Sequence, residues 1–120
     1  MTSKTDDTAL NSPVAKRTAP LRPLFLGTVE IGFPVVQAAL SGYSDWAMRV
    51  MARRLGASYT LSEVMLDQFL LQVRKRQRTK HFLQLSDEER PVGGQLMGAE
   101  PEQFAAGAER LVQAGFDVID

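Results

Sequence analysis

The chain has 120 residues, of which 44% are hydrophobic, so it is long enough and apolar enough to form one globular domain. Its 14 Lys and Arg residues balance 14 Asp and Glu residues, so the net charge gives no argument for nucleic-acid binding, and any RNA contact must come from a local patch. Cysteine is absent, which excludes disulfides, thiolate metal sites and a thiol nucleophile within these residues.

The sequence carries no sign of a membrane span or a secretory signal. No apolar run approaches the roughly 18 residues of a membrane span, and the first residues lack the apolar core of a leader. We therefore expect a cytoplasmic protein without membrane contact. Residues 1–22 are polar and show no hydrophobic period, which predicts a flexible N-terminal tail, and residues 23–120 form the predicted folded domain.

The folded part begins with short apolar segments. Residues 24–26 are apolar and precede Gly27, and residues 29–34 predict a small hairpin or turn. Residues 35–40 form a compact apolar run that predicts a buried strand. Ser44 is expected to cap the helix that follows, with Asp45 in its first turn. The expected apolar face of that helix comprises Ala47, Val50, Met51 and Leu55, and Gly56 ends it.

Two further strand and helix pairs are predicted. Residues 58–62 predict the second strand, and residues 65–80 a helix with apolar positions Leu66, Phe69, Leu70 and Val73 and a basic far end. After a polar loop at 86–89, residues 92–97 predict the third strand, in which Gly93 and Gly94 indicate a close backbone approach. Pro101 begins the third helix, Gly115 ends it, and residues 116–120 begin a fourth strand. The expected apolar face of the third helix comprises Phe104, Ala105, Ala108, Leu111 and Val112.

The alternation of strands and helices is typical of parallel βα units. A TIM (β/α)8-type barrel takes about 250 residues, so we predict an α/β fold in which only the first three to four βα units of such a barrel are present, as a partial barrel in a truncated chain. A small open α/β sheet is the alternative.

Four segments, in this order, resemble the tRNA-dihydrouridine synthase family. Residues 36–45 are similar to the family's first strand and turn, Ala-Pro-Met-Ala-Gly-Val-Thr-Asp, with Ala39 and Leu40 in place of Pro-Met. Residues 53–65 resemble the end of the first helix and the second strand. Residues 90–102 resemble the third strand, which presents a flavin-contacting glutamine, and residues 116–120 resemble the approach to the family's Asn-Met-Gly-Cys-Pro segment.

The resemblance implies an oxidoreductase that converts uridine in tRNA to 5,6-dihydrouridine. NADPH reduces FMN in such enzymes, and the flavin passes hydride to the base while a cysteine donates a proton. That cysteine is not among these residues, so we expect no catalytic residue in this chain and no activity from it alone. The alternatives are a noncatalytic RNA- or flavin-binding relative and another flavin-barrel oxidoreductase that acts on a small molecule.

The expected cofactor site lies at the carboxyl ends of the strands, where barrel enzymes place their active sites. The resemblance implies that Gln95 contacts the pyrimidine edge of the flavin, because an amide both donates and accepts hydrogen bonds. It also assigns Ala39, Leu40 and Ser41 to cofactor binding, where Gly42 permits a close approach. The alternatives without a cofactor are an ordinary strand-to-helix turn at Ser41-Gly42 and a Gln95 that only satisfies buried backbone groups.

The expected substrate contacts are weaker predictions. Glu63 follows the second strand, where it orients a ligand or is simply solvated. Arg74, Arg76 and Arg78 are candidates for contact with tRNA phosphates, although such runs are commonly a solvated helical face. The sole histidine, His81, has no partners at ligand spacing, so no metal site is expected.

Overall fold

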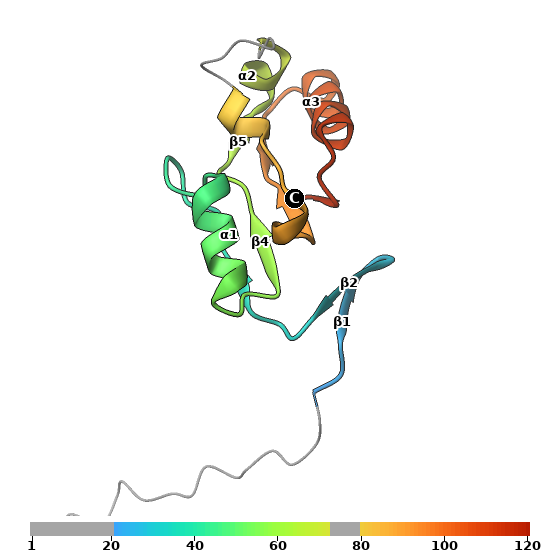
Figure 1. Ribbon diagram of the computed structural model, residues 1–120. Helices are drawn as coiled ribbons and strands as arrows, with labels where there is room; N and C mark the ends of the chain where they lie inside the picture. The colour runs from blue at the N-terminus through green and yellow to red at the C-terminus, as the bar shows by residue number, and fades with distance from the viewer. Residues whose placement is uncertain (1–20, 73–79) are drawn as a thin grey trace, which may run out of the picture.

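The computed structural model describes residues 21–72 and 80–120. Their elements, in chain order, are β1 (Leu24–Leu26), β2 (Val29–Gly32), β3 (Val36–Gln37), α1 (Trp46–Arg54), β4 (Tyr59–Leu61), β5 (Met65–Leu66), α2 (Asp67–Gln72), the 3-10 helices η1 (Lys80–Leu83) and η2 (Asp87–Glu89), β6 (Val92–Gly94), β7 (Leu96–Met97), α3 (Pro101–Ala114) and β8 (Val118–Ile119) (Figure 1). Most of the predicted tail (1–20) and the basic run (73–79) lie outside the described residues.

A four-stranded parallel sheet organises the structure. Its order is β3-β4-β6-β8, so its strands lie side by side in the order in which they occur along the chain, and Thr60 aligns with Val92 and Gly93 with Val118. Helices or loops connect these strands, which confirms the predicted parallel βα arrangement. Neither β3 nor β8 has a second neighbour among the described residues. Closure into a barrel therefore stays a prediction.

A second parallel pair, β5 and β7, extends the sheet beyond a break at Gln95. The predicted strand 92–97 is therefore two strands rather than one. The predicted helix start at residue 65 is wrong, because the backbone N–H of Met65 donates to the carbonyl of Gln95 at 2.9 Å and keeps Met65 in this pair. The described part of that helix is α2, which begins at Asp67.

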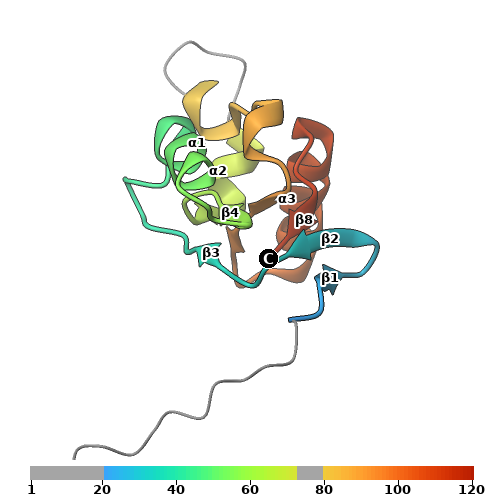
Figure 2. The ribbon, with the colours of Figure 1, turned by 60° about the horizontal axis from the view of Figure 1, so that its bottom comes forward.

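The hairpin β1–β2 lies at the amino-terminal end of the sheet. Its strands are antiparallel, and Gly27 occupies the turn with φ of 60°. Ile31 of the hairpin is buried, and a shallow hollow joins it to Phe33, Ser58 and Pro91, which precede β3, β4 and β6. Figure 2 shows the hairpin across this end of the molecule. The carboxyl ends of the strands are therefore left for a ligand.

The main apolar core lies between the sheet and helices α2 and α3. It comprises Met65, Leu70, Val92, Leu96, Leu111 and Phe116. A Cβ on Gly107 would lie only 3.4 Å from the Cα of Asp67, so this glycine lets α3 approach α2 closely. The predicted ends of α3 are confirmed, because Pro101 is in its first turn and Gly115 adopts a left-handed φ of 99°.

The predicted apolar face of α3 is only partly correct. Leu111 is buried and Ala108 packs against the core, but Phe104, Ala105 and Val112 are exposed. The buried face runs instead through Gly107 and Leu111. Gly107 lies against Leu96 and Asp67, and Leu111 lies in the apolar core.

Three predictions about β3 and α1 are wrong. The strand at 35–40 is only two residues long and Val36 is half exposed, because β3 is an edge strand. The cap of α1 is Asp45, whose Oδ1 accepts from the N–H of Met48 at 2.9 Å, whereas Ser44 is fully buried before the helix. Of the four positions in the predicted apolar face, Val50 is buried, whereas Ala47, Met51 and Leu55 are exposed. Gly56 ends the helix region with φ of 105°, as predicted.

The inward face of α1 is set by Arg49, which is 1% exposed. Its Nε donates to Oε2 of Glu89 at 2.6 Å, its Nη1 to the carbonyl of Ser44 and its Nη2 to the carbonyl of Gln84, both at 2.8 Å. Glu89 is fully buried, and its Oε1 accepts from the N–H of Ser86 at 2.8 Å. The guanidinium therefore joins α1, the turn after β3 and the segment from η1 to η2.

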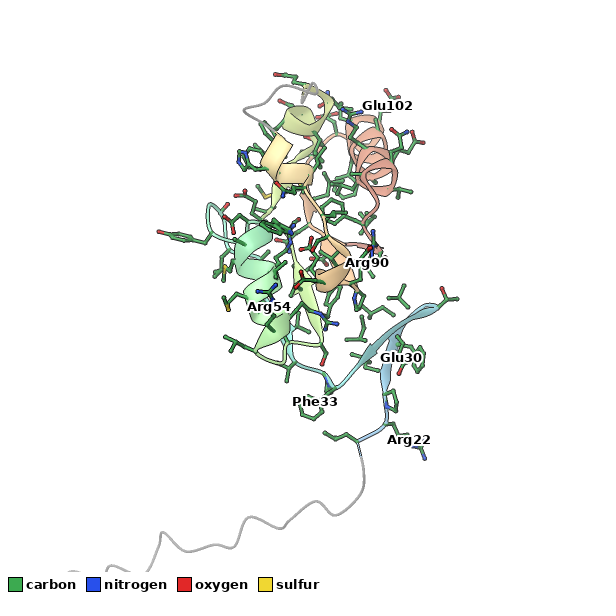
Figure 3. All side chains as sticks on the ribbon, in the orientation of Figure 1. Arg22, Glu30, Phe33, Arg54, Arg90 and Glu102 are labelled. Carbon is green, nitrogen blue, oxygen red and sulfur yellow. The ribbon has the colours of Figure 1, made fainter. Side chains whose placement is uncertain are left out.

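Removing Arg49 should destabilise the protein strongly. In Arg49→Met the carboxylate of Glu89 stays buried without its partner, so we expect the free energy of unfolding in urea to fall by about 3–5 kcal/mol. The matched control is Arg54→Met. Arg54, labelled in Figure 3, pairs with Glu88 at 2.6 Å, but both side chains are more than half exposed, so the loss should stay below about 1 kcal/mol. Equal losses in the two variants would contradict the role given to Arg49.

Candidate functional site

The turn after β3 is held by side chains from three directions. The N–H of Leu40 donates to Oγ of Ser44 at 2.6 Å, inside the turn. The N–H of Gly42 donates to Oε2 of Glu63, beyond the end of β4, at 2.7 Å. Arg49 binds the carbonyl of Ser44 from α1. Gly42 has φ of 77°, which suits glycine, so backbone and side chains fix the turn together.

These contacts decide which backbone donors the turn can offer to a ligand. Leu40 and Gly42 have committed their N–H groups, whereas the N–H of Ser41 has no hydrogen bond to the described residues. Leu40 and Ser41 are exposed, and Ala39 is partly buried. The predicted cofactor-binding turn therefore presents the N–H of Ser41 beside the exposed apolar side chain of Leu40.

Gln95 lies at the break between β6 and β7 and is anchored through its backbone. Its N–H donates to Oγ of the buried Ser62 at 3.2 Å, and its carbonyl accepts from Met65. Its side-chain Nε2 donates to Oδ2 of Asp120 at 2.7 Å. The sequence-based prediction missed Asp120. The available signal was its position directly after β8, at the same edge as Gln95.

The structure brings Glu63 to the turn rather than leaving it solvated. Its carboxylate bridges the ends of β3 and β4 by accepting from Gly42. Glu63, Gln95 and the turn thus share the carboxyl ends of successive strands, as expected for parallel units. The predicted substrate contact of Glu63 stays a prediction.

Gly93 and Gly94 confirm the predicted close approach on opposite faces of the sheet. A Cβ on Gly94 would lie 3.0 Å from Phe116 and 3.1 Å from Leu111, on the side of α3. A Cβ on Gly93 would overlap the hydroxyl of Tyr59 on the other face. Tyr59 is only 5% exposed, so its ring forms an apolar floor on that face of the sheet.

Burial, together with the negative charges of Asp120 and Asp117, raises the pKa of Tyr59 from 10.0 to about 12. The phenol therefore stays protonated in the folded state at neutral pH. Its hydroxyl lies against Gly93, so the side chain packs on the backbone of β6.

The remaining predicted site residues are not brought to this edge. Arg74, Arg76 and Arg78 lie outside the described residues. His81 is exposed, and its ring lies 4.1 Å from the ring of Phe82 between centroids. Among the described residues there is no group of three His, Asp or Glu side chains that could hold a metal ion. Within the same residues, no helix has the length and apolarity needed to cross a bilayer.

The arrangement defines an α/β protein with a candidate ligand site at the carboxyl ends of parallel strands. The family model for dihydrouridine synthase (Dus) matches residues 36–120, and this chain belongs to that family. The resemblance of the sequence segments is thereby confirmed.

Named relatives agree with the family match. The chain is 31% identical over 96 residues to tRNA-dihydrouridine synthase B of Xanthomonas axonopodis pv. citri, covering 79% of this chain and 28% of the relative. It is 31% identical over 86 residues to the same-named protein of Pseudomonas aeruginosa, covering 72% and 25%. It is 28% identical over 95 residues to a probable tRNA-dihydrouridine synthase of Rickettsia conorii, covering 79% and 28%. The chain thus spans about a quarter of the length of these relatives.

The stability of the protein should depend on the ionisation of Tyr59. Because its pKa is higher in the folded state, its contribution is fully present below pH 10 and is lost as the pH rises through 12. Urea unfolding between pH 9 and 12 should show a loss of about 2 kcal/mol that Tyr59→Phe removes.

The matched control for this measurement is Tyr43→Phe. Tyr43 is the other tyrosine of the chain and is 74% exposed. This variant should keep the alkaline loss of the unchanged protein. An alkaline loss of the same size in Tyr59→Phe would show that Tyr59 is not its source.

Proposed function

We propose that this chain is the flavin-binding N-terminal part of a cytoplasmic, FMN-dependent tRNA-dihydrouridine synthase, which reduces uridine in tRNA to 5,6-dihydrouridine with NADPH as the reductant. The observation that carries the proposal is that Gln95 and the Leu40-Ser41 turn both follow the carboxyl ends of strands in one parallel sheet, in a chain of this family. The sheet order β3-β4-β6-β8 supports a partial (β/α)8 barrel as the scaffold.

The residues at this edge suit a flat heteroaromatic ring with one polar edge. Gln95 offers an amide, Ser41 a free backbone donor and Leu40 an exposed apolar side chain. FMN would supply the hydride chemistry, and these residues would bind and orient it. The Ala39 substitution removes the rigidity of the family's proline, but Ser44, Glu63 and Arg49 hold the turn by hydrogen bonds instead.

The proposed tRNA contacts come from Glu63 and from the basic run. The relatives are named as tRNA-dihydrouridine synthases, which supports tRNA as the substrate. Arg74, Arg76 and Arg78 would neutralise phosphates, and Glu63 would approach the target base from the carboxyl end of β4.

A second candidate is a noncatalytic flavin- or RNA-binding relative. It is favoured by Ala39 and Leu40 in place of Pro-Met and by the absence of cysteine among the 120 residues. A flavin-binding relative would also hold its flavin at Gln95, whereas an RNA-binding relative would not. The two candidates differ in whether this polypeptide takes part in uridine reduction.

Flavin binding tests the site directly. The purified chain should bind FMN, and binding is measured by the change in flavin absorbance between the near ultraviolet and the blue. Gln95→Ala should weaken the affinity about tenfold, because one hydrogen bond is lost. Gln113→Ala, an exposed position on α3, should leave it unchanged. The site would be refuted if the folded protein does not bind FMN, or if the Gln95→Ala variant binds FMN as tightly as the unchanged protein.

Turnover and tRNA binding separate the candidates. We expect no NADPH-dependent uridine reduction by the 120-residue chain, and sustained turnover would refute its proposed inactivity and exclude the noncatalytic candidate. We also expect tRNA binding whose logarithmic salt dependence falls by about 2 when Arg74, Arg76 and Arg78 are changed to Gln together. Flavin binding without salt-dependent tRNA binding would favour an oxidoreductase that acts on a small molecule.

A further inference from the structure

The side chain of Gln95 can present either of two opposite groups to a ligand. Its Oε1 accepts hydrogen bonds and its Nε2 donates them, and the two are exchanged by turning the amide over. A carboxylate can only accept. Because Asp120 lies 2.7 Å from Nε2, the amide must turn its nitrogen toward Asp120, which leaves Oε1 without a partner among the described residues.

The backbones of both residues are fixed, so only the amide orientation is free to vary. Gln95 is bonded through its N–H to Ser62 and through its carbonyl to Met65. The backbone N–H of Asp120 donates to the carbonyl of Gly94 at 3.0 Å, and its backbone carbonyl accepts from the N–H of Leu96 at 2.8 Å. Gly94 and Ile119 are register partners, so Gln95 and Asp120 follow them side by side at the ends of neighbouring strands.

We propose that Asp120 is a positioning residue that fixes Gln95 as a hydrogen-bond acceptor, so that the site selects ligands with a cyclic imide N–H. The proposal rests on the proposed flavin site and deepens it. An imide N–H flanked by two carbonyls occurs in the pyrimidine ring of a flavin and in a uracil base, and it matches the free Oε1. The flavin and the uracil base share this imide, and the test distinguishes them by using ligands of both kinds.

The test compares ligands with and without the imide proton. The unchanged protein should bind FMN at least about tenfold more tightly than N3-methyl-FMN if Gln95 meets the flavin, measured by quenching of flavin fluorescence. It should prefer uridine monophosphate to its 3-methyl derivative by a similar factor if Gln95 meets the substrate base, measured by calorimetry. A preference in either pair supports the proposal and identifies the source.

Substitution of Asp120 tests the positioning role. In Asp120→Asn the new amide can donate to Oε1 and lets Gln95 turn over, so the preference should fall below about threefold. Asp120→Glu keeps an acceptor-only group and should retain part of the preference. Glu30→Gln is the matched control, since Glu30 lies on the hairpin (Figure 3), in the hollow with Ser58 and Pro91 before β4 and β6, and it should keep the full preference.

Each remaining outcome counts against the proposal in a distinct way. Full preference in a folded Asp120→Asn protein, checked by circular dichroism, would overturn the positioning role and leave the flavin site standing. FMN binding without any preference in the unchanged protein would overturn the acceptor role of Gln95. Binding of neither ligand pair by the folded unchanged protein would overturn the proposed function and this inference with it. If Asp120→Asn does not fold, the preferences of the unchanged protein and of Asp120→Glu decide the matter.

Discussion

The buried guanidinium of Arg49 is the interaction on which the candidate site depends. A buried charge is tolerated only where its partner and its hydrogen bonds are complete, and Arg49 meets that condition through Glu89 and the carbonyls of Ser44 and Gln84. One of those carbonyls belongs to the turn after β3. The geometry of the turn and the packing of α1 are therefore parts of a single constraint.

The site edge is assembled by polar contacts between the ends of neighbouring strands. Glu63 reaches back to Gly42 at the end of β3, Ser62 supports the backbone of Gln95, and Gln95 reaches forward to Asp120. Each contact joins one strand end to the next, in the order of the sheet. A ligand at this edge would therefore meet groups whose positions are set by their neighbours, which is the condition for precise recognition.

The sequence predicts those features that depend on nearby residues. The parallel βα arrangement and the ends of α3 at Pro101 and Gly115 follow from local periodicity and turn chemistry, and the structure confirms them. The hairpin or turn predicted at residues 29–34 instead pairs residues 24–26 with residues 29–32. Gln95 was identified through the family resemblance. It follows β6, and β4 separates that strand from β3 and its turn, so its cofactor contact stays a prediction.

The failures share a different cause, which is dependence on distant partners. Arg49 reads as a surface residue until Glu89, 40 positions later, supplies its charge partner. The same pair turns α1 so that Met51 and Leu55 face outward. Asp120 could be found only from its position directly after the last strand, because its role exists only where β8 lies beside β6. A local sequence pattern cannot predict a contact when only the pairing of the strands brings the second residue close.

Asp120 also connects the polar edge to the apolar floor beneath it. The charge that orients Gln95 is one of those that raise the pKa of Tyr59. A phenolate beside this carboxylate would be both buried and repelled, so the neutral phenol is strongly favoured. The buried ring of Tyr59, which packs against Gly93, therefore stays uncharged. The negative charge at the ends of β6 and β8 is that of Asp120, which directs the amide of Gln95.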